Sequence, residues 1–266
     1  MTSWMKARMF DLVSRMGYTV IPTWRIHRFS QVNYMKNLIN FLSIDCIVDV
    51  GANTGQYARY LRDEVGYGGL ICSFEPIPAH TAALRRDAAR DPKWQVEECA
   101  LGRSAERKIF HVTSNTEFSS FLAPDMEFGD FNALAAVAEE IPVTVRTLDD
   151  VVPRIRERHG VKNIHLKLDT QGYDLEVLAG GKNTIGDVAS LQSEMAVQRI
   201  YEGMPDFREA TRFIEDQGFV ISQFFPNNEG HFPKLIEFDC YAINRARIGG
   251  SVVPAATSGA APIAPA

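Results

Sequence analysis

The stretch from residue 46 to residue 75 restricts the fold of this chain more than any other part of it. It begins with Cys46–Val50, an apolar and β-branched run with the length of one buried strand. Residues 51–55, which include two glycines, separate this run from a helical pattern, and a second apolar run, Leu70–Phe74, leads to Glu75. A strand, a glycine loop, a helix, a second strand and an acid in this order predict half of a nucleotide-binding α/β unit.

The positions of the glycines and acids indicate which ligand such a unit would hold. Gly51 and Gly55 allow a tight turn and a close approach of the backbone, and the following helix presents free N–H groups to an anion. Asp49 precedes them, so the pattern is D-x-G-x-x-x-G and not the G-x-G-x-x-G that admits a pyrophosphate. Asp49 suits an amine or a sulfonium, and Glu75, at the tip of the second strand, suits both hydroxyls of a ribose. S-adenosylmethionine combines these groups, whereas a tight corner without a ligand would need neither acid.

The composition is typical of a globular α/β protein with one domain. The 266 residues are 45% hydrophobic and 23% charged, and the net charge of -5 argues against a general nucleic-acid-binding role. No apolar segment approaches the roughly 20 residues that span a bilayer, and no signal peptide is found. The cysteines lack C-x-x-C spacing and fall in or beside predicted strands, which indicates reduced, buried thiols in a cytoplasmic protein: Cys46, Cys72, Cys99 and Cys240.

Residues 1–44 differ in charge from the rest of the chain. They carry six basic residues against one acid (+5), which leaves 22 basic and 32 acidic residues (-10) in the remainder. The first helix could lie on an anionic membrane or a lipid-linked substrate, at the inner face of the membrane, or it could pack on the domain, which we favour. A second helix is expected over 30–42. The apolar residues that recur at helical spacing in the first helix are Trp4, Met5, Met9, Leu12, Val13 and Met16.

Residues 165–172 are the second informative stretch. A strand covered on both faces should be apolar at nearly every position, but His165, Lys167 and Asp169 alternate with leucines and share one face. Three ionisable groups in a row predict a strand that borders a cleft rather than a helix layer, unless it is an edge strand facing solvent. Asp169 ends this strand and Glu194 ends the next predicted strand, and open α/β sheets keep their ligands at such carboxyl ends.

The rest of the chain shows alternating helix and strand patterns, with no internal repeat and no second domain. A polar loop over 114–130 has Ser119 and Ser120 at its centre, and a short helix is expected over 133–140. The tail from residue 249 is rich in Gly, Pro, Ala and Ser and is expected to be disordered. Further strands are expected over 94–98, 107–113, 143–146, 188–194, 219–225 and 238–244, and further helices over 79–90, 148–159, 173–179 and 207–217.

Several of these motifs resemble the FkbM family of S-adenosylmethionine-dependent methyltransferases. The resemblance implies a class I methyltransferase fold over 44–246: an α/β, Rossmann-like, seven-stranded and mostly parallel sheet with helices on both faces and an antiparallel last strand. A helical segment over 1–43 would precede it, and a tail over 247–266 would follow. The similar segments occur in order along the chain and are residues 48–55 with 73–76, 99–102, 146–149, 166–172 and 201–203.

The resemblance also implies O-methylation, commonly of sugar hydroxyls in glycolipids or polysaccharides, or of hydroxyls on polyketide products. Many members have Glu at the position of Gln171 and others have Gln, so no role is transferred to this residue. Acceptor contacts are expected from Ser119 and Ser120 at the centre of the polar loop, and from Tyr201 and Glu202 in the last similar segment. Cofactor contacts are expected from Asp49, Gly51, Asn53, Thr54, Gly55, Tyr57, Glu75, Pro76, Ala100 and Leu101.

The chemistry of methyl transfer asks for alignment, a dry pocket and, for an alcohol acceptor, a general base. Asp169 and Glu194 are the candidate bases, with His231 from a loop as a third. The two carboxylates could instead bind Mg²⁺ that holds a sugar diol, but no third ligand is evident, so no metal is expected. Asp169 could also pair with Lys167, or contact the methionine end of the cofactor, without moving a proton.

Two other functions fit parts of the pattern. A nucleotide-dependent oxidoreductase is disfavoured because the G-x-G-x-x-G spacing is absent. A cofactor-binding scaffold without catalysis is disfavoured because Asp49, Gly51, Gly55, Glu75 and Asp169 are all present. The pattern carries no signal for an oligomeric state, and we expect a small-molecule or glycan acceptor with no nucleic-acid partner.

Overall fold

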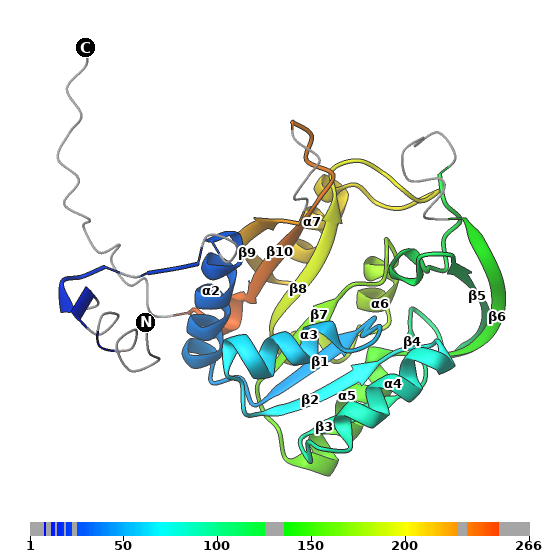
Figure 1. Cartoon of the computed structure of the whole chain (residues 1–266). Coiled ribbons are helices and arrows are strands. Elements are labelled where there is room, and N and C mark those ends of the chain that lie inside the picture. The colour runs from blue at the N-terminus through cyan, green and yellow to red at the C-terminus, as the bar shows by residue number, and fades with distance from the viewer. Residues whose placement is uncertain are drawn as a thin grey trace.

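The computed structural model describes residues 26–125, 136–227 and 233–249, together with residues 8, 12–13, 15–18 and 20–22. A seven-stranded sheet forms the centre of the molecule (Figure 1). Five neighbouring strands are parallel, and β10 runs antiparallel to the strands on both of its sides, which confirms the expected class of fold. In order across the sheet the strands are β3 (Trp94–Glu97), β2 (Leu70–Phe74), β1 (Cys46–Val50), β7 (Ile164–Leu168), β8 (Val188–Ala196), β10 (Glu237–Asn244) and β9 (Phe219–Pro226).

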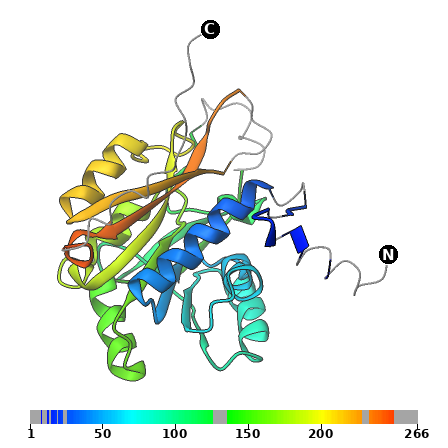
Figure 2. The same ribbon diagram turned by 90° about the vertical axis from the view of Figure 1, so that its left-hand side faces the viewer.

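Helices cover both faces of this sheet (Figures 1 and 2). In chain order, the first three described helices pack on one face of the sheet, in a core with Ile47, Ile71 and Tyr241. The last three helices pack on the other face, in a core with Val48 and Leu166. The helix over 148–159 is found with the predicted bounds, because Thr147 caps its first turn and Gly160 ends it in the left-handed conformation. The helices are α2 (Ile26–Leu42), α3 (Gln56–Tyr60) with a π-helical turn (Leu61–Val65), α4 (Pro78–Ala88), then α5 (Leu148–His159), α6 (Asp174–Ala179) and α7 (Phe207–Asp216).

A second, three-stranded sheet stands beside the carboxyl ends of the central strands (Figure 1). It consists of β4 (Ala100–Leu101), β6 (Val137–Arg146) and β5 (Glu106–Thr113), and a 3-10 turn (Thr116–Phe118) follows β5. The short helix predicted over 133–140 is wrong, because residues 137–140 continue β6 in an antiparallel ladder with β5; residues 133–135 lie outside the described chain. The small sheet has its own apolar core with Ile77, and it supplies one wall of the site described below.

The row of ionisable residues on β7 does not border a cleft along its whole length. His165 is fully buried beneath the helices: its Nδ1 lies 2.8 Å from Ser190 Oγ, and its Nε2 lies 3.4 Å from the Tyr57 hydroxyl of α3. Burial lowers the pKa of His165 to about 3, so the ring is neutral. The expectation of a cleft is therefore wrong for His165, because only the end of the strand, with Lys167 and Asp169, reaches the cavity.

The N-terminal region is described only in part. The helix expected over 30–42 is confirmed as α2, which starts four residues earlier and buries Met35 and Leu38 against the sheet. Leu12 and Met16 are exposed, so these two side chains do not pack on the domain, whereas the other apolar positions before Leu12 and the tail beyond residue 249 lie outside the described residues. None of the described helices has the length and apolarity to cross a membrane. The four cysteines are free and buried, as predicted.

Candidate active site

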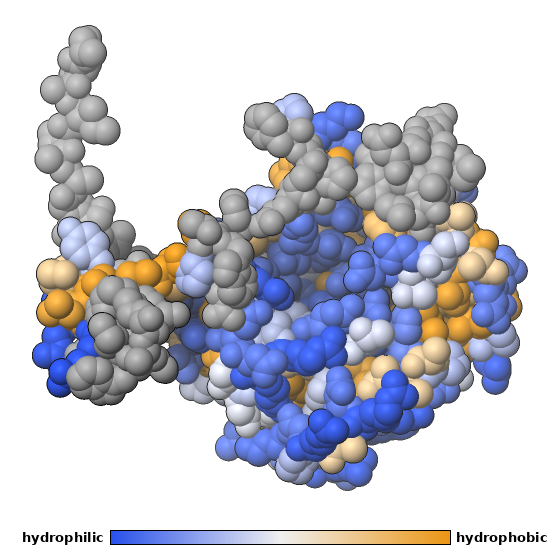
Figure 3. Space-filling view, viewed as in Figure 1, coloured by the Kyte–Doolittle hydropathy of each residue, from blue (hydrophilic) through white to orange (hydrophobic). Residues whose placement is uncertain are grey.

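A cavity of about 350 Å³ opens at the carboxyl ends of the central strands, beside the small sheet. Its size falls in the range of small-molecule sites. Hydrophilic residues surround the hollow in the space-filling view (Figure 3). Nine of the predicted site residues line it: Gly51, Asn53, Glu75, Pro76, Ala100, Leu101, Ser119, Asp169 and Glu194.

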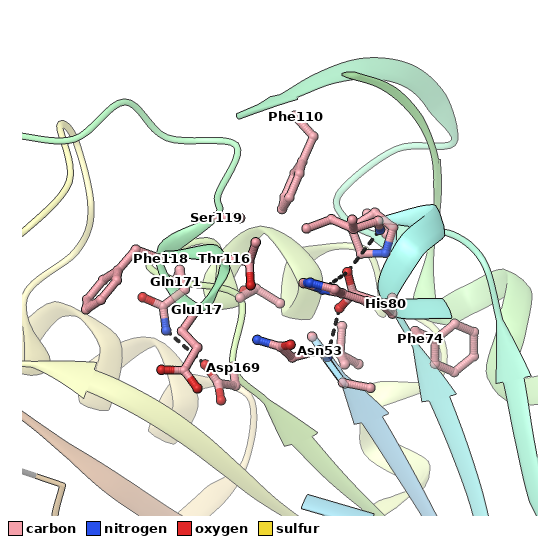
Figure 4. Close-up of a pocket in the computed structure, with 18 of the residues that line it drawn as sticks. Asn53, Phe74, His80, Phe110, Thr116, Glu117, Phe118, Ser119, Asp169 and Gln171 are labelled. Carbon is pink, nitrogen blue, oxygen red and sulfur yellow. Dashed lines mark hydrogen bonds and ion pairs between the residues drawn. The ribbon is translucent and has the colours of Figure 1, made fainter. Parts of the chain in front are cut away.

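Glu75 is held at one side of the cavity by the backbone. Its two carboxylate oxygens accept hydrogen bonds from the N–H groups of Asn53 (2.8 Å) and Ile77 (2.9 Å), and the side chain is almost completely buried. His80, in the first turn of α4, lies with its Nδ1 3.6 Å from the same carboxylate, and this buried nitrogen has no hydrogen-bond partner among the described residues. Figure 4 shows Asn53 and His80 close together among the residues that line the cavity. Each carboxylate oxygen keeps a lone pair for a further donor.

Gly51 brings two strand-end loops into contact. Its φ is +77°, and a Cβ placed there would lie 1.9 Å from the carbonyl oxygen of Asp169. A side chain at this position would therefore push the loop after β1 away from the loop after β7. Gly51, which the sequence predicts to let a ligand approach the backbone, also lets the two loops approach each other closely.

Asp49 lies beneath the cavity floor instead of in the cavity. It is fully buried, accepts a hydrogen bond from Ser73 and lies 3.3 Å from the Lys167 ammonium, which is 3.2 Å from Asp169 on its other side. Burial alone would lower the pKa of Lys167, but Asp169 and Asp49 together raise it above its usual value, so Lys167 stays charged. Asp49 thus reaches the cavity only through Lys167.

The two predicted catalytic carboxylates are brought together by a third residue. The Gln171 amide nitrogen donates to Asp169 Oδ1 and to Glu194 Oε2, each at 3.0 Å (Figure 4 shows the first of these bonds). The Tyr201 hydroxyl lies 2.9 Å from both Gln171 Oε1 and the carbonyl oxygen of Phe118. Sequence reasoning gave Gln171 no role, and its only signal was its position two residues after Asp169.

Acidic neighbours shape the electrostatics of this end of the cavity. Burial, with the nearby charges of Asp169, Glu237 and Asp239, raises the pKa of Glu194 well above its usual value. Burial and acidic neighbours also raise the pKa of Glu237, which lines the cavity from β10, to about 7. Carboxyls that titrate nearer to neutral pH are suited to accept a proton from a hydroxyl.

Two of the remaining predicted residues, Tyr57 and Ser120, contact residues of the site from outside the lining. Tyr57 lies under the Lys167 ammonium, 5.2 Å from its ring centre, and donates to Gln192, while Ser120 donates to the backbone carbonyl of Gln171. His231 lies outside the described residues, and the described part of the chain contains no group of three residues placed to hold a metal ion. Besides Ser120, the predicted contact residues that are absent from the described cavity lining are Asp49, Thr54, Gly55, Tyr57, Tyr201 and Glu202.

The sequence of this chain is similar to that of known methyltransferases. The model of the methyltransferase FkbM domain matches residues 49–221. The 2-O-methyltransferase NoeI of Sinorhizobium fredii is 27% identical over 203 residues, 73% of this chain and 76% of that protein. The 31-O-demethyl-FK506 methyltransferase FkbM of Streptomyces tacrolimicus is 26% identical over 215 residues, 73% of this chain and 79% of that protein. The crystal structure of methyltransferase FkbM from Methylobacillus flagellatus covers 75% of this chain and 43% of that chain, at 17% identity and a TM-score of 0.48.

Proposed function

The chain belongs to the FkbM methyltransferase family, and we propose that it transfers the methyl group of S-adenosylmethionine to a hydroxyl of a sugar in a glycolipid, a polysaccharide or a related natural product. The observation that carries this proposal is the pair of carboxylates, Asp169 and Glu194, that Gln171 joins beside the loop after β1. Two relatives are named for methylation at oxygen, which supports the choice of a hydroxyl acceptor.

The residues around Glu75 fit the adenosine half of the cofactor. The carboxylate is fixed by two backbone N–H groups and keeps lone pairs for two ribose hydroxyls, and the unpartnered Nδ1 of His80 faces the same space. When bound, S-adenosylmethionine supplies an electrophilic methyl group. Asp169 provides negative charge for the sulfonium and the methionine ammonium, with Lys167 holding its second oxygen.

Glu194 is the better candidate for the general base. Asp169 forms an ion pair with the Lys167 ammonium, 3.2 Å away, so one of its oxygens already has a cationic partner. Glu194 accepts hydrogen bonds from the amides of Gln171 and Asn227, and burial with acidic neighbours raises its pKa, which makes it a stronger proton acceptor than a carboxylate in water. Glu194 would take the proton of the acceptor hydroxyl as the oxygen attacks, and Asp169 would orient the reactants.

The charge of the cavity indicates which acceptors it suits. Lys167 already pairs with two carboxylates, so the lining carries an excess of negative charge. An uncharged polyol or an acceptor with an amine fits this field, whereas a phosphorylated sugar would be repelled at the reacting end. The acids that line the described cavity are Glu75, Glu117, Asp169, Glu194 and Glu237.

Two experiments test the proposal. Calorimetry should detect binding of S-adenosylmethionine and no binding of NAD, which would reject the oxidoreductase alternative. Incubation with methyl-labelled S-adenosylmethionine and an extract of the native host should then label a glycan or a glycolipid. Cofactor binding without formation of S-adenosylhomocysteine in such an extract would favour the scaffold alternative instead.

A further inference from the structure

Gln171 has an unusual backbone conformation for its residue type. Its φ is +52°, in the left-handed region that favours glycine, and a non-glycine residue there costs on the order of 1 kcal/mol or more. Such a conformation persists where the surrounding contacts hold it. Here the side chain makes three hydrogen bonds with Asp169, Glu194 and Tyr201, and the backbone carbonyl accepts a fourth from Ser120.

The orientation of the Gln171 amide follows from its neighbours. The nitrogen has two N–H groups, and each one meets a different carboxylate, while the oxygen meets the Tyr201 hydroxyl. The reversed amide would turn its oxygen toward both carboxylates, which have no proton to donate when ionised. The donor capacity of the amide is therefore fully used by Asp169 and Glu194.

We propose that Gln171 is a positioning residue that fixes the carboxylates of Asp169 and Glu194 relative to each other and favours the ionised form of Glu194, so that Glu194 can act as the base while Asp169 orients the reactants. The catalytic part of this inference rests on the proposed function, whereas the hydrogen-bond geometry of Gln171 is independent of it. Two neighbouring carboxylates repel each other, and donors that bond to their charged forms offset this repulsion. The Tyr201 hydroxyl lies 2.9 Å from the Gln171 amide oxygen and 2.9 Å from the backbone carbonyl of Phe118, and its one proton can go to either acceptor.

The other charged and polar groups around the pair do not replace this bridge. On the β7 side, Lys167 contacts the second oxygen of Asp169, and on the other side Asn227 donates to the second oxygen of Glu194. From β10, Glu237 and Asp239 add negative charge that raises the pKa of Glu194. Gln171 is the described residue that donates to both carboxylates.

A conservative substitution separates the bridge from the strained backbone. Gln171→Asn keeps an amide and tolerates the left-handed conformation, but its side chain is one methylene shorter and cannot reach both carboxylates. Gln223→Asn is the matched control, because it makes the same chemical change at an exposed residue of β9 that lies outside the described lining of the cavity. If Gln171→Asn does not fold, Gln171→Glu serves as the second variant, since its ionised carboxylate has no proton to donate.

The measurement is a ¹³C NMR titration of the side-chain carboxyls in the full chain, with the Glu194 signal assigned by its loss in Glu194→Gln. In Gln171→Asn the pKa of Glu194 should rise by about 1 to 2 pH units, the worth of one hydrogen bond to a charged group. The acid limb of kcat/KM should move to higher pH by the same amount, whereas Gln223→Asn should change neither the Glu194 pKa nor the pH profile. A folded Gln171→Asn or Gln171→Glu with the parental Glu194 pKa would overturn the inference. A shifted pKa in a protein that transfers no methyl group would refute the proposed function instead.

Discussion

Replacing Glu75 with glutamine should weaken the binding of S-adenosylmethionine while the protein stays folded. In the parent, both carboxylate oxygens accept backbone N–H groups, from Asn53 and from Ile77, and both face the cavity. The glutamine has one accepting oxygen, so its NH₂ group must face one of these backbone donors. Glu75→Ala is the less informative variant, because it would leave both buried donors unpaired and lower the stability as well.

The magnitude follows from the bonds that the carboxylate can offer. Two charge-assisted hydrogen bonds to the ribose hydroxyls are worth roughly 2–4 kcal/mol together. At 1.4 kcal/mol for each factor of ten, this loss corresponds to about a 30- to 700-fold rise in Kd. The fold should survive, because one backbone donor keeps its acceptor and the side chain keeps its size.

Isothermal calorimetry with S-adenosylmethionine measures the effect, and circular dichroism checks the fold. Glu97→Gln is the matched control, because Glu97 ends the neighbouring strand β3, is exposed and lies outside the described lining of this cavity. The control should bind as the parent does. If folded Glu75→Gln binds S-adenosylmethionine within threefold of the parental Kd, the ribose assignment is wrong.

Three further outcomes are expected. Glu194→Gln and Asp169→Asn should bind the cofactor nearly normally but lose roughly 10²–10⁴ in kcat, and parental turnover in both variants would move the search for the base to His231. A chelator should leave the activity of the parent unaffected, whereas chelator-sensitive activity that Mg²⁺ restores would support the metal alternative. Because the pKa of Glu237 is raised to about 7 in the folded protein, the parent loses stability as the pH rises from about 4.5 through 7. In urea unfolding, Glu237→Gln should therefore be more stable than the parent at pH 8, by on the order of 1–2 kcal/mol, and as stable as the parent below pH 4. If residues 1–44 contact a membrane, the protein should sediment with anionic vesicles at low salt and be released at high salt, whereas no sedimentation at low salt would refute the membrane contact.

The central unit of the fold could be predicted because its signals are local. Strand length, glycine spacing and the acid at the strand tip all lie within thirty residues, and the structure places Gly51, Asn53 and Glu75 around one cavity. The sequence predicts the second part of β6, over 143–146, but not its first part. The two acids at 139 and 140 obscure the alternation there, and the pairing of this part with β5 is a long-range property. The helix predicted there had only local propensity behind it.

The candidate site was only half predictable for the same reason. Asp169 and Glu194 could be placed at one sheet edge, because parallel strands end together. The role of Gln171 depends on partners 23, 30 and 51 residues away, and no spacing in the sequence reveals such contacts. The sequence predicts Asp49 in the cavity, but Asp49 lies beneath the cavity floor, where it forms an ion pair with Lys167.

The most direct test of the proposed function is to identify the acceptor atom to which the methyl group is transferred. S-adenosylmethionine carrying a ¹³C-methyl group should be incubated with the protein and an extract of glycolipids and polysaccharides from the native host, and the product examined by NMR. We predict a methoxy carbon on a sugar carbon, formed in equal amount with S-adenosylhomocysteine and strongly reduced with Glu194→Gln. A ¹³C-methyl group attached to nitrogen or carbon, or a methoxy product that Glu194→Gln and Asp169→Asn both form at the parental rate, would contradict the account.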